Sequence, residues 1–393
     1  MSRVRRDRNL ARLLILAALS ALAPISMDAY LPALPELGYD LDASASATQA
    51  TLTACLIGLG AGQLLAGPLS DSLGRRRPLL VGLAAFTAAS VLCALAPSIW
   101  TLITLRLLQG IAGGAGIVIA RAVARDLFSG SALARYLALM MTAANVAPVL
   151  APLIGAQFLH FTSWRGVFVA VGIFGAALLA GAAARLAESL PRERRHPAGL
   201  ARTSATFRRL LADSSFVGYL LCCGLPFAAM FAYIAGSPFV LQDIHGLSAT
   251  EFSLVFAVNS IGIMAASRLS AALVRRVSPR RVLAAGLIAC AVGSLGVLLA
   301  VVLDAGLAGL LPPLFVMVSS VGLALPNATA LALADHEREA GSASALVGVG
   351  QFVTGAAVAP LVGVAGPGTA LPMAILIAIC GTAALLPFAL LTR

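Results

Sequence analysis

The sequence predicts an all-α integral membrane protein with twelve transmembrane helices, arranged as two six-helix bundles related by pseudo-twofold symmetry. The first observation is composition: 60% of the 393 residues are hydrophobic, 11% are charged, and the mean hydropathy is +0.96. Such a chain is too apolar to form a soluble core inside a charged surface. The second observation is that long uncharged runs recur along the whole chain, and the third is an internal repeat. We therefore expect a lipid bilayer to be the solvent.

Each predicted span is a run of about 20 apolar residues, the length that crosses roughly 30 Å of hydrocarbon. The runs of the first half cover residues 10–31, 47–69, 78–96, 99–122, 135–158 and 165–187. Those of the second half cover residues 214–238, 249–274, 282–303, 307–333, 341–364 and 368–391. Pro97-Ser98 and the stretch from Gly363 to Gly368 separate neighbouring runs, because Pro and Gly favour turns. An even number of spans places both ends on the same side of the membrane.

The domain organisation follows from a repeat and from a charged connection. Residues Leu69–Arg76 resemble Leu269–Arg276, 200 positions later, and each copy follows the second span of its half. We expect an N-terminal bundle over 1–187, a cytoplasmic linker over 188–213 and a C-terminal bundle over 214–393. The latter part of the linker could form a helix on the membrane surface, where arginine gains from anionic lipid, or it could be a solvated tether.

The arginines predict the orientation. All 27 basic residues are arginines, spread over alternate loops, whereas the intervening loops carry acids such as Glu36, Asp40 and Asp243, with Arg165 as the exception. The positive-inside rule makes the arginine-bearing side cytoplasmic, so both termini are expected there. The net charge of +11 forms no single basic patch, which argues against nucleic acid. The arginines of the cytoplasmic side lie before span one, at 75–77, 121–135, 185–209 and 275–281, and at Arg338.

The sequence lacks the motifs that are typical of other classes of function. The six cysteines lie in apolar runs without a CxxC spacing, so we expect packing residues and neither disulfides nor zinc. There is no HExxH or GxSxG, which argues against an enzyme, and no phosphate-binding GxxxxGK[ST] loop. We expect no cofactor, and an ion or substrate gradient as the source of energy. The four histidines lie in or beside loops, at His160, His196, His245 and His336.

The loop after the second span carries the first family motif. The segment Gly67–Pro78 reads GPLSDSLGRRRP and is similar to the signature loop of the major facilitator superfamily. Gly74 permits a tight turn, and Asp71 can accept hydrogen bonds from Arg75 or from a helix N-terminus. Gly67, Asp71, Gly74 and Arg75 are therefore expected to form a cytoplasmic gate; alternatively, the charges serve only topology. The second copy lacks the acid and the glycine, so any latch there is weaker.

The end of the first span indicates a subfamily. Ser26–Pro35 reads SMDAYLPALP and closely resembles the corresponding segment of drug:proton antiporters of the Bcr/CflA type, named for bicyclomycin and chloramphenicol or florfenicol resistance. A carboxylate within a span is costly unless it faces a cavity, where it can exchange a proton near neutral pH. We expect Asp28 to be the proton-coupling residue. The alternative is an interfacial aspartate that caps a helix end.

The fourth span carries Arg106, Gln109 and Gly110 in a segment that matches the RxxqGxga motif of the superfamily. An arginine inside a span costs about 2.5–3.5 kcal/mol on insertion scales, so it should face a polar interior and find a partner. Counting from the span ends places Arg106 in the same half of the membrane as Asp28. A cation beside the acid would promote proton release, so Arg106 joins the predicted proton-coupling site.

The fifth span is similar to the antiporter motif gxxxGPxxGG of drug exporters, with Asn145, Pro148, Pro152 and Gly155 as its candidate residues. It departs from the pattern at Ala147 and Ala151, where glycines are common. Prolines can kink the helix, and small residues allow close contact. Polar residues within or beside other spans are candidates for substrate binding, although each could instead form a helix-to-helix hydrogen bond: Tyr30, Gln109, Tyr233, Asn259, Asn327 and Gln351.

The resemblance implies proton-coupled export of a drug or antibiotic, drug out and proton in, by alternating access. Amphenicol-like or bicyclomycin-like compounds are the implied substrates. The expected partners are the small-molecule substrate, protons and membrane lipids, and the chain is expected to act as a monomer. The same scaffold hosts many substrates, so a transporter of an endogenous metabolite is the alternative.

Overall fold

The computed structural model describes residues 3–195, 200–336 and 339–392. Arg338 and His196 lie outside the described residues. Within them, twelve helical segments are long and apolar enough to cross a membrane, which confirms the predicted all-α fold of twelve spans. These segments are Arg12–Asp40, Ala45–Leu73, Arg76–Ala94, Ile99–Leu127, Arg135–Leu159, Trp164–Arg185, Ser214–Ile244, Ala249–Leu273, Pro279–Val302, Gly306–Ala334, Gly341–Gly363 and Leu371–Leu390.

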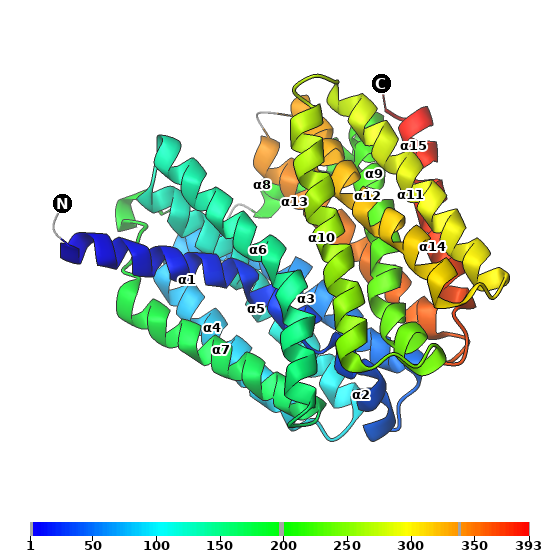
Figure 1. The fold of residues 1–393 in the computed structure, drawn as a ribbon. Helices are drawn as coiled ribbons and strands as arrows, with labels where there is room; N and C mark the ends of the chain where they lie inside the picture. Colours follow the sequence, from blue (N-terminus) through cyan, green and yellow to red (C-terminus); the bar gives the residue numbers. More distant parts are fainter. Residues whose placement is uncertain (1–2, 196–199, 337–338, 393) are drawn as a thin grey trace. The chain divides into compact units, whose positions relative to one another are not determined.

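The helices form two compact units. Unit 1 comprises Met1–Glu36 and Ala54–Gly199, and unit 2 comprises Leu37–Thr53 and Leu200–Arg393. In unit 1, α1 packs against α5, α6 and α7, and α4 packs against α5 and α7; α1, α4 and α7 run side by side in Figure 1. The helices of unit 1 are α1 (Arg3–Asp28), the part of α3 (Ala45–Leu73) from Ala54 onward, α4 (Arg76–Ala94), α5 (Ile99–Leu127), α6 (Gly130–Leu159) and α7 (Trp164–Arg185), with the short η2 (Arg192–Arg194).

Unit 2 is built around α9, which packs against α12, α13 and α14, while α11 packs closely against α12. Its helices are most of α2 (Leu34–Asp40), α8 (Leu200–Ala212), α9 (Ser214–Pro238), η3 (Phe239–Ile244), α10 (Ala249–Leu273), α11 (Pro279–Val302), α12 (Gly306–Ala334), α13 (Ala340–Val358), η5 (Ala359–Gly363), α14 (Leu371–Ala383) and α15 (Leu385–Leu390).

Several boundaries differ from those expected from hydropathy. The first span is three elements, because α1 ends at Asp28 and the chain continues through η1 (Leu31–Ala33) into α2. Pro32 cannot donate a backbone hydrogen bond, which favours this change of helix type. α5 extends to Leu127, past the apolar run that ends near 122, because backbone hydrogen bonds continue through charged residues. The last run is divided at Ala384 into α14 and α15.

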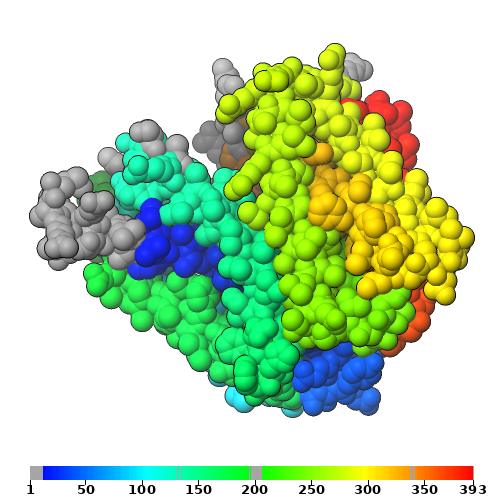
Figure 2. Space-filling view, in the orientation of Figure 1, coloured from blue at the N-terminus to red at the C-terminus, as the bar shows by residue number. Residues whose placement is uncertain are grey.

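The segment Leu37–Thr53 groups with the C-terminal helices. The Gln49 amide Nε2 donates to the backbone oxygen of Ala235 at 3.2 Å, and the Thr53 hydroxyl donates to that of Ala356 at 3.4 Å. Figure 2 shows this segment, coloured blue, against the green atoms that follow α9. These contacts link residues that are about 190 and 300 positions apart, which hydropathy does not predict.

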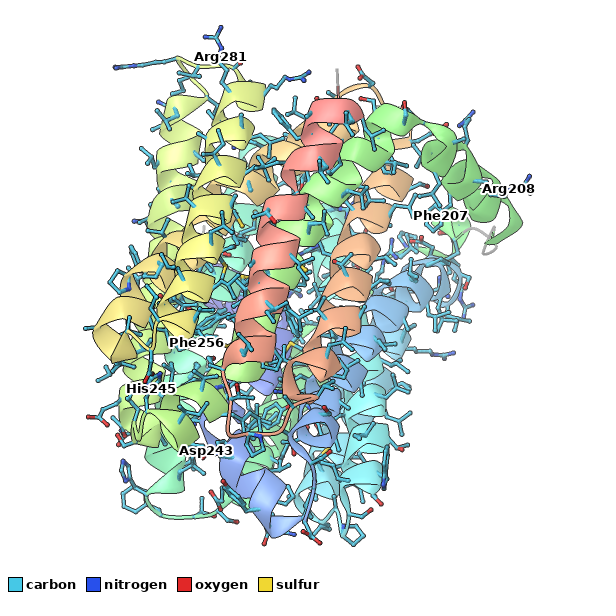
Figure 3. The ribbon with its side chains drawn as sticks, turned by 90° about the vertical axis from the view of Figure 1, so that its right-hand side faces the viewer. Phe207, Arg208, Asp243, His245, Phe256 and Arg281 are labelled. Carbon is cyan, nitrogen blue, oxygen red and sulfur yellow. The ribbon has the colours of Figure 1, made fainter. Side chains whose placement is uncertain are left out.

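The amphipathic helix α8 occupies the latter part of the predicted linker. Its Leu210 is buried in the hydrophobic core of unit 2 beside Phe216, and Phe207 packs against the same cluster. Figure 3 shows Arg208 on this helix, pointing away from the core. α8 therefore anchors the segment to unit 2 through its apolar face and keeps its charge outside.

The six cysteines are packing residues, as the sequence predicts. All six lie within the described residues, and all are buried and free of disulfide bonds: Cys55, Cys93, Cys222, Cys223, Cys290 and Cys380.

Glycines let α3 and α5 approach to backbone contact in unit 1. A Cβ atom added to Gly110 would overlap the backbone oxygen of Cys55, and one added to Gly62 would overlap that of Ile111. Gly58 and Gly114 make the same kind of contact with the opposite helix. Small residues four positions apart on both helices form the close packing that is typical of membrane helices.

Gly110→Ala is therefore expected to lower the stability of the protein by about 1–3 kcal/mol, the usual cost of overpacking a tight site. The measurement is thermal unfolding of the purified protein in detergent. Gly348→Ala in α13 is the matched control, because a Cβ there meets no heavy atom within 4 Å. Equal unfolding temperatures for Gly110→Ala and Gly348→Ala would contradict the close contact.

Candidate functional site

Arg106 is the centre of a buried cluster in unit 1. Arg106 is 0% exposed and lies in the first third of an apolar helix, α5. Nη1 donates to the backbone oxygen of Ser26 at 3.1 Å and to the Gln109 Oε1 atom. The guanidinium carbon lies 4.5 Å from the centre of the Tyr30 ring and 5.5 Å from that of Phe168. Carbonyl dipoles and aromatic faces thus solvate the cation.

Asp28 belongs to the same cluster. It is the last residue of α1 and is 7% exposed. Its carboxylate acts on Arg106 through charge, whereas the direct contacts described for the guanidinium are to neutral groups. An acid whose counter-ion is held in place by other contacts can gain and lose a proton without releasing that counter-ion. The structure therefore brings together Asp28, Tyr30, Arg106 and Gln109.

Gln109 uses both ends of its amide within the protein. Oε1 accepts from Arg106, and Nε2 donates to the Ser90 hydroxyl at 2.7 Å, which itself donates to the backbone oxygen of Phe86 at 2.7 Å. Gln109 is 0% exposed. This geometry orients Arg106 and leaves the amide no surface for a ligand. Ser90 was not among the residues singled out from the sequence, because a serine in an apolar span carries no recognisable spacing.

The antiporter-motif residues line α6, which packs on α1. A Cβ atom at Gly155 would overlap the backbone oxygen of Ala29, so this glycine allows α6 to touch the chain directly after Asp28. Pro148 and Pro152 lie inside α6, which remains helical from Gly130 to Leu159. Asn145 is exposed on the same helix. Of the four residues, Gly155 is the one that the structure places next to the Asp28 cluster.

The signature loop forms a second polar cluster in unit 1. Gly74 has a φ of +93°, a left-handed conformation that favours glycine. Arg75 Nη1 contacts Asp71 Oδ1 at 2.5 Å and donates to the Ser70 hydroxyl at 2.7 Å, and Nε donates to Asp126 Oδ2 at 3.1 Å. Arg75 is buried and Asp71 is exposed. Gly67 lies one turn earlier on α3, where an added Cβ would make ordinary contact with Val118.

Sequence reasoning missed two acids of this cluster, Asp126 and Glu188. Glu188 Oε1 accepts from the backbone N–H groups of Arg75 at 2.8 Å and Leu190 at 3.0 Å, and Oε2 accepts from that of Arg76 at 3.2 Å. Burial alone would raise the pKa of Glu188, but these hydrogen bonds and the Arg195 guanidinium lower it below its usual value. Neither acid has a sequence signal beyond its place in an arginine-rich segment.

The candidates in unit 2 make hydrogen bonds between helices. Asn259 Nδ2 donates to the Tyr233 hydroxyl at 2.9 Å, and both side chains are buried. Asn327 Nδ2 donates to the Ser270 hydroxyl at 2.7 Å, which joins α12 to α10. Gln351 is partly buried on α13 and lies beside Cys223. The structure thus pairs Tyr233 with Asn259, and it places Asn327 and Gln351 in separate contacts.

Comparison with known families decides the identity of this scaffold. The family model described as Major Facilitator Superfamily matches residues 16–360, which is most of the chain. The chain belongs to the major facilitator superfamily. It is accordingly a multi-pass membrane protein with the family and fold of a transporter.

Relatives of this major facilitator extend along most of its length. An uncharacterized MFS-type transporter of Bacillus subtilis, YdgK, is 38% identical over 90% of this chain and 88% of its own. A bicyclomycin resistance protein homolog of Haemophilus influenzae is 29% identical over 88% and 86%. A chloramphenicol resistance protein of Pseudomonas aeruginosa is 33% identical over 66% and 61%. These relatives confirm the expected Bcr/CflA type.

Solved structures confirm the fold of this major facilitator. The crystal structure of a D-xylose-proton symporter matches with a TM-score of 0.76 at 18% identity, covering 100% of this chain and 98% of the symporter. That of the nucleoside transporter NupG matches with a TM-score of 0.76 at 12% identity, covering 97% and 100%. At these identities, the likeness concerns the fold alone.

Glu188→Gln is expected to destabilise this major facilitator at neutral pH. Because the folded-state pKa of Glu188 lies below the ordinary value of 4.5, the contribution of the carboxylate is fully present above that value. It is lost as the pH falls through the folded-state pKa. The difference in unfolding temperature between wild type and variant should therefore shrink on acidification below about pH 4. Glu193→Gln, at an exposed acid of the same linker, is the control, and a difference independent of pH would contradict the assignment.

Proposed function

We propose that this major facilitator exports a drug or antibiotic in exchange for protons, by alternating access. The observation that carries the proposal is a buried acid–arginine pair in a chain whose relatives are named for bicyclomycin, chloramphenicol and multidrug resistance. Amphenicol-like and bicyclomycin-like compounds are the proposed substrates, and the proposed unit of transport is the monomer.

In this proposal Asp28 carries the proton. The fixed cation of Arg106 stabilises the Asp28 carboxylate when the proton leaves. When the proton returns, Asp28 becomes neutral and no longer balances the charge of Arg106. The rings of Tyr30 and Phe168 lie against the guanidinium and stabilise its charge. Gln109 accepts a hydrogen bond from Arg106 and is itself bonded to Ser90, so it fixes the position of the arginine. We therefore propose a positioning role for Gln109 and not substrate binding.

We propose that the Asp71–Arg75–Asp126 cluster is part of the cytoplasmic gate. One arginine that bridges an acid on α3 and an acid on α5 fastens the cytoplasmic ends of these helices, and Gly74 allows the loop to place Arg75 between them. The pair Asp71–Arg75 is partly solvated, so its contribution to stability is small. A weak latch suits a contact that must break in each cycle.

The proposed orientation places the arginine-rich loops and both termini in the cytoplasm. In unit 2, Figure 3 shows Arg208 and Arg281 at one end of the helices and Asp243 at the opposite end. This separation of charge follows the positive-inside pattern and supports a position in the bacterial plasma membrane with that end inward.

The experiment that tests the function is drug susceptibility in an efflux-deficient bacterial host. Expression of the chain should raise the inhibitory concentration of chloramphenicol, florfenicol or bicyclomycin, and a protonophore should remove accumulation differences between cells with and without the protein. Unchanged susceptibility to all three compounds would contradict the substrate class. Efflux that persists with the protonophore would contradict proton coupling.

A further inference from the structure

A cavity of about 660 Å³ lies at one end of unit 1, away from the Asp28 cluster. Three arginines from three different helices line it, namely Arg12 of α1, Arg76 of α4 and Arg185 of α7. The rest of its wall is formed by residues 183–188, at and just beyond the end of α7. A cavity of this size can hold a small polar group, and its charge favours an anion.

The position of this cavity in the membrane follows from the ends of the spans that line it. Arg76 is the first residue of the third span and Arg185 the last of the sixth, and Arg12 of α1 donates to the backbone oxygen of Arg185. All three arginines therefore lie where apolar helix gives way to polar solvent, at the level of lipid headgroups. α1, α4 and α7 lie side by side in Figure 1, so the three boundaries coincide in one place.

The arginines are held in place by the end of α7. Arg76 donates from Nε to the backbone oxygen of Leu186 and from Nη2 to that of Ala183, both at 2.9 Å. Arg12 donates from Nε to the backbone oxygen of Arg185 at 3.2 Å. These carbonyls lack intrahelical partners, because they lie at or just beyond a helix C-terminus. Within the described residues, the remaining N–H groups of Arg12 and Arg76 make no hydrogen bond, so they are available to a ligand.

Glu188 does not neutralise the cavity. Its carboxylate already accepts three backbone N–H groups and lies 3.8 Å from the Arg195 guanidinium. Three arginines thus face one acid whose acceptors are occupied. The excess of positive charge, together with open guanidinium donors, matches a phosphate group, which arginine binds through two parallel hydrogen bonds.

We propose that this cavity binds the phosphate of an anionic phospholipid such as phosphatidylglycerol. Ile15, about one turn below Arg12 on the same face of α1, is partly exposed and lies beside Gly181 of α7, so it offers an apolar surface for the acyl chain. A lipid in this place would join the ends of α1, α4 and α7 and stabilise unit 1. This site is separate from the proposed transport pathway and does not depend on the cargo.

The test compares Arg12→Gln/Arg185→Gln with Arg275→Gln/Arg281→Gln, a control pair of exposed arginines at other span ends. Each protein is purified and placed in nanodiscs of phosphatidylcholine alone or with phosphatidylglycerol. Phosphatidylglycerol should raise the unfolding temperature of wild type and control. Two lost charge contacts should weaken phosphatidylglycerol binding, measured by native mass spectrometry, by roughly 10- to 30-fold in the first variant. Arg12→Lys/Arg185→Lys, which keeps the charge, should recover most of the binding.

A second arm distinguishes lipid from free anion by adding inorganic phosphate to protein in phosphatidylcholine nanodiscs. Stabilisation by phosphatidylglycerol beyond that by inorganic phosphate supports a lipid site. Equal stabilisation by inorganic phosphate, or equal loss of lipid binding in the control pair, would overturn the proposal. If Arg12→Gln/Arg185→Gln fails to fold, the single variant Arg12→Gln is measured in its place, and phosphatidylglycerol binding equal to that of the control pair would overturn the proposal as well.

Discussion

Asp28→Asn is expected to abolish proton-driven drug transport while leaving the chain folded. Asparagine has the shape of aspartate but no proton to exchange, so the exchange of proton for drug has no carrier. The fold should persist, because Arg106 keeps its contacts with Ser26, Gln109 and the Tyr30 ring. The measurement is drug movement in reconstituted vesicles with an imposed pH difference, which should fall to the level of vesicles without protein.

Asp42→Asn is the matched control for this variant. Asp42 lies outside the buried cluster and has a φ of +48°, a conformation that asparagine tolerates well. The control should transport like wild type, and both variants should unfold at similar temperatures. Transport against a pH difference at the wild-type rate by Asp28→Asn would remove the proton-coupling assignment, whatever the cargo is.

Arg106→Gln is expected to abolish transport and also to lower stability. Removing one charge from a buried set leaves the Asp28 carboxylate without its counter-ion and the Gln109 Oε1 atom without its donor, and losses of this kind cost about 3–5 kcal/mol. Without the cation, the deprotonated form of Asp28 has no stabilising charge, so the exchange of proton for drug should stop. The measurements are the same vesicle assay and the unfolding temperature in detergent.

Two further variants separate charge from geometry at this position. Arg106→Lys keeps the charge but lacks the planar guanidinium that lies against the Tyr30 and Phe168 rings, so it should retain stability in part and transport weakly. Arg165→Gln removes an arginine that also stacks on an aromatic ring, Trp164, at 4.2 Å, but outside the cluster, and it should transport normally. Wild-type transport by Arg106→Gln would show that the acid works without its cation.

The fold could be predicted from the sequence because bilayer thickness fixes the length of each apolar run. The ends of the helices could not, since the helix continues as long as backbone groups pair. α5 continues through Arg121 and Arg125 to Leu127, although the hydropathy pattern ends the apolar run at these charged residues. The change from α1 to η1 and α2 after Asp28 was also hidden, because Leu31, Ala33 and Leu34 are as apolar as a continuous span.

The centre of the candidate site was readable because charge inside an apolar run is rare and costly. Asp28 and Arg106 stand out for this reason, whereas the Asp71–Arg75 pair stands out through the motif of its loop. Their supporting residues do not. Ser90 and Asp126 belong to residue types that occur at many structural positions, and only the folded chain shows that they bind Gln109 and Arg75. The same holds for Gln109, whose contacts decide between positioning and ligand binding.

The burial of every native thiol has a practical consequence. Thiol-specific reagents should find little to react with on the folded protein, because all six cysteines lie in its interior. A cysteine introduced at an exposed position would then be the main reporter in an otherwise unreactive chain. Membrane-impermeant maleimides added to whole cells could read the sidedness of each loop, one substitution at a time, without first rebuilding the protein to remove its own sulfur.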